Sequence, residues 1–276
     1  MTPEISEFSY GFALTNEIVG WAPVAAAPLF PSLIEEGKAG GGYDVRLDMS
    51  GVALYLQFKR ADCMIRTNAR EIQQYRLAIS VPFYRFKITE SGKSDQHEML
   101  LALTETSNLV FYAAPRFHEL AEIDEAWAIN RVAARSIFVS PKEIGELDDD
   151  SHHIAYDDNR AWLCSDPKQI NFHGSSGLIE QIERRLHEDP RPLRSKLREI
   201  VSEVEGAKER AVNKIRDRKG FELPPIETPR REEPRLSTPL RAPRALSEDE
   251  QLMRNLSDDA AKTFNAQLIV VQPRRA

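Results

Sequence analysis

The sequence has few cysteines, no long apolar run and no secretory start. Cys63 and Cys164 are its only cysteines in 276 residues, so at most one disulfide can form and a disulfide-rich scaffold is excluded. No apolar run reaches the roughly 18 residues that a membrane span needs. The first seven residues are acidic and lack the basic and apolar segments of a signal peptide. We therefore expect a cytoplasmic protein without a membrane partner.

Charge is unevenly divided along the chain. Hydrophobic residues make up 41% and charged residues 29%, which is typical of a globular protein. Residues 1–176 carry 16 Lys and Arg against 25 Asp and Glu, whereas residues 177–276 carry 21 against 18. Because the net charge is −6, any nucleic-acid binding has to come from a local basic surface. The two parts are therefore expected to have different roles.

The spacing of apolar residues predicts one α/β domain over residues 1–176. Alternating polar and apolar residues on both sides of Ser50 and Gly51 predict a β-hairpin whose strands cover residues 43–49 and 52–59. The other predicted elements are helices over 9–21, 67–79, 94–105 and 119–131, a break at the prolines of 22–31, and strands over 83–89, 109–113, 136–140 and 152–156.

The chain changes character after residue 176. Residues 177–220 are predicted to form a helical extension, residues 221–246 a proline-rich, partly disordered linker, and residues 247–276 a C-terminal helix and tail capped by Ser247 and Glu250. The extension carries an apolar stripe at spacings of three and four: Leu193, Leu197, Ile200, Val204, Ala207 and Ala211. Such a stripe needs a surface to cover it, so we expect a homodimer or larger assembly through this helix, with residues 247–276 as a mobile secondary contact.

Three polar residues of the predicted hairpin share one face of the sheet. With Ser50 and Gly51 as the turn, Asp44 lies opposite Gln57, and Lys59 follows two residues further along the same face. A carboxylate and a carboxamide oxygen can hold Mg²⁺ (or Mn²⁺), and an ammonium group can stabilise charge that develops on a phosphate. This constellation predicts metal-assisted hydrolysis of phosphodiester bonds.

The same residues resemble a known family. Asp44 on one strand, Gln57 and Lys59 on the next, and Glu17 on a preceding helix resemble the PD-(D/E)XK nuclease superfamily, over about residues 5–115. The resemblance implies a restriction-endonuclease-like mixed sheet flanked by helices. It also implies that Glu17, Asp44 and Gln57 bind the metal and that Lys59 assists catalysis. The chain departs from the family pattern at Gly42 and Tyr43, which replace the proline before Asp44, and at Gln57, which replaces an acidic residue.

Basic residues outside the hairpin are candidates for binding nucleic acid. Arg116 follows a predicted strand, where ligand contacts collect in α/β sheets, and it can either contact a phosphate there or belong to a buried structural turn. Lys208, Arg210 and Lys214 belong to a basic cluster on the predicted long helix. They can bind phosphates, or they can be the solvated face of a helix whose apolar stripe already explains it.

The expected function is that of a Mg²⁺-dependent endonuclease acting on DNA. The chain carries no motif of a motor or nucleotide sensor, so those roles would come from partner proteins, as is typical of bacterial restriction and anti-phage systems. One alternative is a catalytically inactive member of the same fold that binds nucleic acid or assists assembly, with Gln57 marking the lost chemistry. A third reading is an unrelated fold whose tail mediates protein association.

Overall fold

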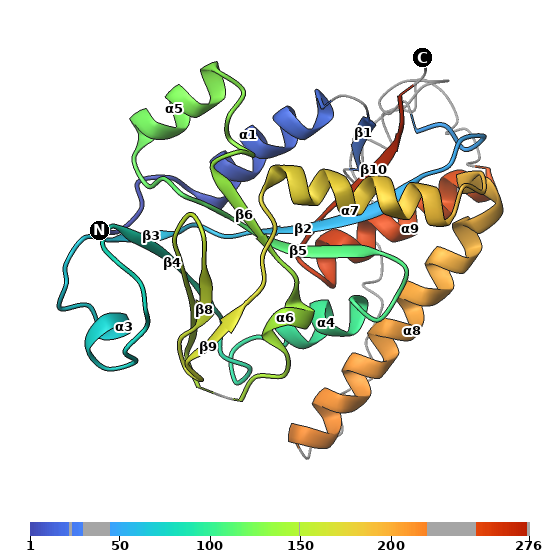
Figure 1. Ribbon diagram of the computed structural model, residues 1–276. Helices are drawn as coiled ribbons and strands as arrows, with labels where there is room; N and C mark the ends of the chain where they lie inside the picture. Colours follow the sequence, from blue (N-terminus) through green and yellow to red (C-terminus); the bar gives the residue numbers. More distant parts are fainter. Residues whose placement is uncertain (22–23, 30–44, 149, 220–246, 275–276) are drawn as a thin grey trace, which may run out of the picture.

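The computed structural model of the chain contains two five-stranded β-sheets (Figure 1). It describes residues 1–21, 24–29, 45–148, 150–219 and 247–274. The first sheet has the order β1 (Val24–Leu29), β10 (Gln267–Pro273), β2 (Val52–Phe58), β5 (Leu109–Pro115) and β6 (Ser136–Val139). The second has the order β3 (Asp62–Met64), β4 (Phe83–Ile88), β7 (His152–Tyr156), β8 (Ala161–Leu163) and β9 (Lys168–Ile170).

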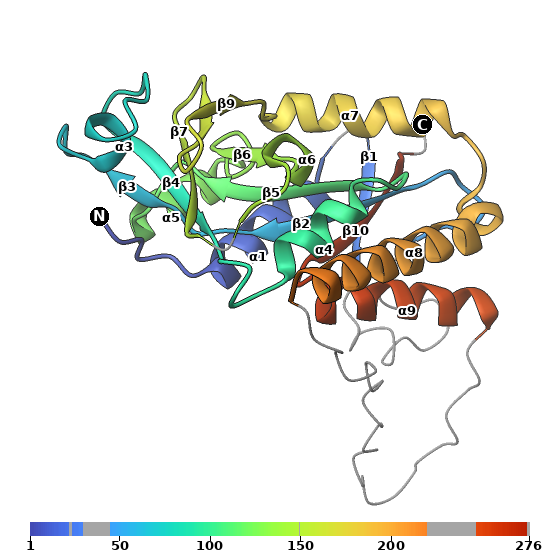
Figure 2. The same cartoon turned by 90° about the horizontal axis from the view of Figure 1, so that it is seen from below.

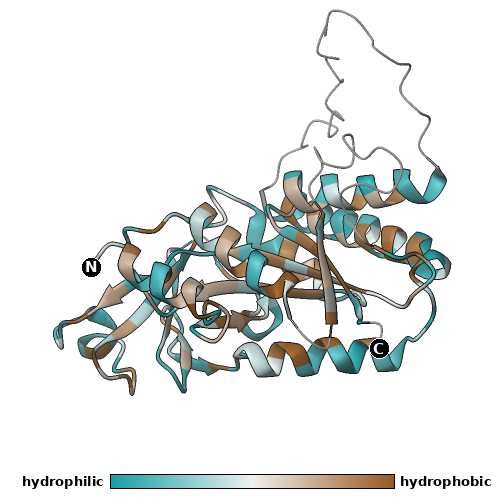
Figure 3. Cartoon of the chain, turned by 90° about the horizontal axis from the view of Figure 1, so that it is seen from above, coloured by the Kyte–Doolittle hydropathy of each residue, from teal (hydrophilic) through white to brown (hydrophobic). Residues whose placement is uncertain are grey.

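Helices cover both faces of the first sheet (Figure 2). One face packs against α1 (Glu7–Val19), α5 (Leu120–Ala128) and α7 (Ser175–Glu188). The other packs against α4 (Gln96–Leu103), α6 (Pro141–Ile144), α8 (Leu193–Lys219) and α9 (Glu248–Lys262), and against side chains of the second sheet. Between β3 and β4 lies the short α3 (Arg70–Gln73). The mixed α/β architecture with flanking helices is therefore confirmed, and apolar residues concentrate on the inner strands and inner helix faces (Figure 3).

Strand β10 occupies the edge of β2 with which residues 43–49 were predicted to pair. It pairs antiparallel with both β1 and β2, and β2 pairs parallel with β5 on its other edge. The prediction that residues 43–49 pair with β2 is therefore wrong. The apolar run of residues 268–271 can be buried on both faces, whereas residues 43–49 would place charged side chains on the face that α9 covers. Residues 43 and 44 lie outside the described residues.

Residues 45–51 instead tie the start of α8 to the end of β10. The N–H groups of Leu193 and Arg194 donate to the carbonyl oxygens of Met49 and Leu47, at 2.7 and 2.9 Å. The side chain of Gln272 accepts from the N–H of Arg46 at 2.8 Å and donates to its carbonyl oxygen at 2.9 Å. These bonds occupy backbone groups of the segment that a hairpin would otherwise have used.

Two other predicted elements differ from the structure. The break over residues 22–31 contains β1, which tolerates Pro28 because it lies at the edge of its sheet. The helix over residues 67–79 is limited to α3, since the chain turns at Arg76, where φ is +51°. The remaining predicted helices and strands are present with shifts of a few residues at their ends.

The apolar stripe of α8 is buried within its own chain. Leu197 and Val204 are each 1% exposed, all six stripe residues are buried, and all but Ala211 belong to the core formed with α4 and α9. The expected dimer contact through this stripe is therefore wrong. Residues 247–274 do not form the expected mobile contact either, because α9 starts with the predicted Ser247 and Glu250 capping box and β10 lies inside the first sheet.

We predict that the fold depends on β10. Ile269 is fully buried and faces α1 and α7, so Ile269→Ala should lower the free energy of unfolding by about 2–5 kcal/mol. Urea unfolding followed by circular dichroism measures this change. Arg274→Ala, at an exposed residue just after the strand, is the control and should stay within about 0.5 kcal/mol of the unmodified chain. Equal losses in the two variants would contradict the assignment.

Candidate functional site

Gln57 and Lys59 lie together where β2 ends. Val52, Leu54 and Leu56 face the α1 side of the sheet, so Gln57 points to the opposite face, and Lys59 continues in the same alternation. The backbone of Lys59 stays attached to the sheet, because its N–H donates to the carbonyl oxygen of Ala113 on β5 at 2.8 Å. The two side chains therefore occupy the carboxyl end of a parallel strand pair, where α/β proteins often bind ligands.

Gln57 has a buried oxygen without a partner. Its side chain is 3% exposed, and Oε1 forms no hydrogen bond with any described residue. A buried acceptor left unsatisfied costs about 1–3 kcal/mol. The oxygen is therefore free to accept a hydrogen bond or to contact a cation.

Lys59 is a buried cation without a carboxylate in contact. It is 7% exposed, and none of the described acidic residues forms an ion pair with it. Burial lowers the pKa of its ammonium group, and the more distant charge of Glu7 opposes this shift. The ammonium nitrogen lies 5.5 Å from the centre of the Tyr112 ring, so the aromatic face supports it electrostatically.

A hydrogen-bonded chain fixes the Tyr112 ring beneath Lys59. Tyr112 lies beside Gln57 in the parallel β2–β5 ladder. Its hydroxyl is 2.9 Å from Nδ1 of His97, and Nε2 of His97 is 2.7 Å from the carbonyl oxygen of Gly145. Because a carbonyl can only accept, Nε2 carries the proton and Nδ1 accepts from Tyr112. Burial lowers the pKa of His97, which favours this neutral form.

Glu17 does not belong to this cluster. It lies on α1, and its Oε2 accepts the N–H of Ala133 at 3.1 Å on the other face of the first sheet. The prediction that Glu17 shares a metal with Gln57 is therefore wrong, because α1 and the Gln57 side chain are separated by the sheet itself. Asp44 lies outside the described residues.

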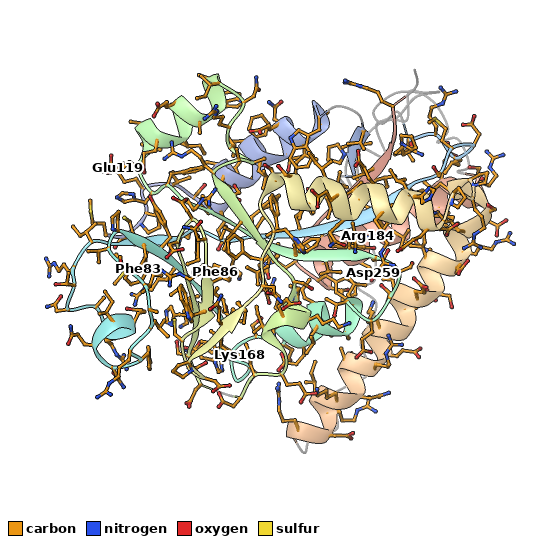
Figure 4. The ribbon with its side chains drawn as sticks, viewed as in Figure 1. Phe83, Phe86, Glu119, Lys168, Arg184 and Asp259 are labelled. Carbon is orange, nitrogen blue, oxygen red and sulfur yellow. The ribbon has the colours of Figure 1, made fainter. Side chains whose placement is uncertain are left out.

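Arg116 and the α8 cations are occupied by protein groups. Arg116 donates to the carbonyl oxygen of Ala134 and pairs with Asp158 at 3.1 Å. The three predicted α8 cations form ion pairs: Lys208 with Asp259 at 2.9 Å, Arg210 with Glu105 at 3.3 Å, and Lys214 with Glu146. Asp259 is labelled in Figure 4. These carboxylates neutralise the charges that were expected to bind nucleic acid.

The described residues fit a metal ion only in part. Among them, no three His, Cys, Asp or Glu side chains are grouped closely enough to hold one. The unpartnered oxygen of Gln57 is a suitable but neutral ligand, and the strand pairing that was expected to bring the Asp44 carboxylate to it is not formed.

Comparisons with known proteins add no assignment. No family model, curated protein or solved structure matches the chain. No helix in the described ranges is long and apolar enough to cross a membrane.

Sequence reasoning missed Tyr112 and His97. His97 has no nearby motif, and its role depends on α4 placing it against β5, a contact between elements that periodicity does not reveal. Tyr112 lies in an apolar run, LVFYAA, whose alternation gives its face only after the strand order is known.

We predict that the Tyr112 hydroxyl stabilises the fold. Tyr112→Phe keeps the ring but leaves Nδ1 of His97 buried without its donor, so the free energy of unfolding should fall by about 1–3 kcal/mol. Tyr75→Phe is the matched control, since the Tyr75 hydroxyl forms no hydrogen bond within the described residues. Urea unfolding of the two variants is the measurement, and a loss in the control alone would refute the assignment.

We also predict that His97 makes the chain sensitive to acid. Its pKa is lowered in the folded chain, so below about pH 6.5 the unfolded chain binds a proton that the folded chain does not. As the pH is lowered, the free energy of unfolding should therefore decrease, by at most about 1.4 kcal/mol per pH unit from this group. The decrease should end when the pH reaches the pKa of His97 in the folded chain. His97→Gln should give a shallower decline than the unmodified chain. Burial also lowers the pKa of His153, so His153→Gln should independently make the decline of the unfolding free energy with falling pH less steep.

Proposed function

We propose that this chain is a divalent-metal-dependent nuclease of the restriction-endonuclease-like type, with DNA as its expected substrate. The observation that carries the proposal is a buried Gln57 oxygen without a hydrogen bond, on the same face at the end of β2 as a buried Lys59 side chain that has no ion pair among the described residues. Burying a polar or charged group without a partner is unfavourable. A site completed by a cation and a phosphate accounts for this cost.

Each residue has a distinct role in the proposal. Gln57 would hold Mg²⁺ or Mn²⁺ through its side-chain oxygen. The role of Asp44 as the charged metal ligand rests on the family resemblance alone, because the strand pairing that would bring it to Gln57 is not formed. An ion held there would polarise the phosphodiester and activate water. Lys59 stabilises the negative charge that develops on the phosphate oxygens, and the low-dielectric surroundings strengthen that interaction. Tyr112 holds the ammonium in place from below.

On the basis of the family resemblance, the proposed role of this chain is that of an effector or subunit of a bacterial restriction or anti-phage system. A separate protein would supply any motor or sensor. A second copy, where one is needed to cut both strands of a duplex, has to bind through a surface other than the buried α8 stripe.

Cleavage assays test the proposal directly. We expect the purified protein to cut plasmid, linear or single-stranded DNA with Mg²⁺ and not with a chelator. Asp44→Ala and Lys59→Ala should each reduce the rate by about 100-fold or more, because the first removes the proposed charged metal ligand and the second removes the positive charge that stabilises the transition state. Gln57→Glu should keep or raise the rate, since it restores a carboxylate.

The matched control is Lys168→Ala, at an exposed lysine on β9 (Figure 4). It should leave the rate unchanged. Cleavage that persists in Asp44→Ala at the unmodified rate would show that a different site, or a contaminant, does the cutting.

A second candidate function is that of an inactive member of the same fold. It is favoured by the neutral side chain of Gln57 and by the position of Glu17 on the opposite face, which leaves the site with less negative charge. Titration calorimetry with Mn²⁺ separates the two candidates. Heat of binding that disappears in Asp44→Ala supports the nuclease, and no binding in the unmodified chain supports the inactive subunit.

A further inference from the structure

The segment that follows Lys59 is strongly basic in an otherwise acidic chain. Residues 59–87 contain seven Lys and Arg against two Asp and Glu, whereas residues 1–176 as a whole have an excess of acidic residues. The segment includes β3, α3 and the loops that join them to β2 and β4. Figures 1 and 2 both show α3 at one end of the molecule, beyond the edges of β3 and β4.

One arginine uses both carboxylates of this segment. Arg85 pairs with Glu71 at 2.6 Å and with Asp62 at 3.3 Å. Glu71 is 2% exposed, so it belongs to the interior and does not reduce the surface charge. The remaining arginines have no acidic neighbour within the segment to neutralise them.

Four arginines of the segment remain exposed: Arg60, Arg66, Arg70 and Arg76. None of them forms an ion pair with a described residue. Arg70 donates from Nε to the Gln74 side chain at 3.1 Å and lies 5.9 Å from the centre of the Tyr75 ring, and both contacts preserve its charge. These four residues, called here the arginine surface, contrast with the α8 cations, which are paired.

The backbone at Arg76 adds a separate observation. Its φ is +51°, a conformation that costs an arginine more than it costs asparagine or glycine. The other non-glycine residues with positive φ in the described ranges are both asparagines, Asn130 and Asn265. Such strain concentrates at functional positions.

We propose that the arginine surface binds the phosphate backbone of a nucleic acid and leads it to Lys59. Arg60 directly follows Lys59, so the surface starts beside the proposed catalytic site. Guanidinium groups match phosphate geometry, and exposed Thr67, Asn68 and Gln73 supply neutral donors between them. The direction toward Lys59 rests on the proposed function, whereas the binding itself does not.

An anionic membrane is a less suitable partner. Membrane-surface binding needs apolar side chains beside the basic ones. Among the described residues of this segment, one large hydrophobic side chain is exposed, that of Ile65, at 52%. The arginine surface therefore has the charge for lipid headgroups without the apolar area to insert.

Binding measured without cleavage tests the inference. Fluorescence anisotropy in EDTA follows the full chain with a 20-base-pair DNA duplex, a 20-nucleotide single strand and an RNA duplex. If the four arginines each contact one phosphate, the slope of log K against log salt on the DNA duplex is about −3.6. Replacing all four by Gln should abolish most of this slope and weaken binding at least tenfold, whatever the base sequence.

The control variant removes the same amount of charge elsewhere. It replaces Lys208, Arg210, Lys214 and the exposed Arg184 of α7 (Figure 4) by Gln, and should bind almost as the unmodified chain does. Unchanged binding in the four-arginine variant, or an equal loss in the control, would overturn the inference. So would tighter binding to phosphatidylserine vesicles than to any nucleic acid.

Arg76→Gly separates binding from stability. Glycine adopts a positive φ freely, so this variant should be at least as stable as the unmodified chain toward urea, yet its salt slope should be smaller by about 1. A purely structural role for Arg76 predicts no change in the slope and would contradict its place in the surface. Loss of binding in the arginine variants together with inactive Mg²⁺-loaded protein would retain the surface and reject the nuclease.

Discussion

The pairing of β10 with β1 and β2 is the interaction on which the rest of the structure depends. It joins residues 267–273 to strands from the first sixty residues, and both of its faces are buried. On one side it completes the surface that α1 and α7 cover, and on the other it supports α9 and, through α9, the stripe of α8. The N-terminal and C-terminal parts of the chain therefore share one core.

This pairing also determines the environment of the candidate site. With β10 on one edge and β5 on the other, β2 has no freedom to rotate, so Gln57 must face Tyr112 and the α4 side. His97 then positions the Tyr112 ring, and the ring supports Lys59. Three elements of the same core therefore position the site: β2 carries Gln57 and leads into Lys59, β5 carries Tyr112, and α4 carries His97.

The sequence predicts local elements well and their partners poorly. Helices α4 and α5, the α8 stripe and the Ser247 capping box follow from periodicity and cap residues close in the chain. The predicted hairpin is wrong because β10, a more apolar strand some 200 residues away in the chain, pairs with the same edge of β2. Gln57 and Lys59 keep their shared face because alternation within one strand is local, whereas the position of Glu17 depends on which face α1 covers.

The position of β10 in the chain has a consequence for synthesis. Until residue 273 has left the ribosome, β1 and one edge of β2 cannot be paired by it. An unpaired, apolar strand edge is a template for pairing with another chain. The nascent protein thus exposes these strand edges while the residues between β2 and β10 are being made, and the sheet closes in a step that joins sequence-distant residues.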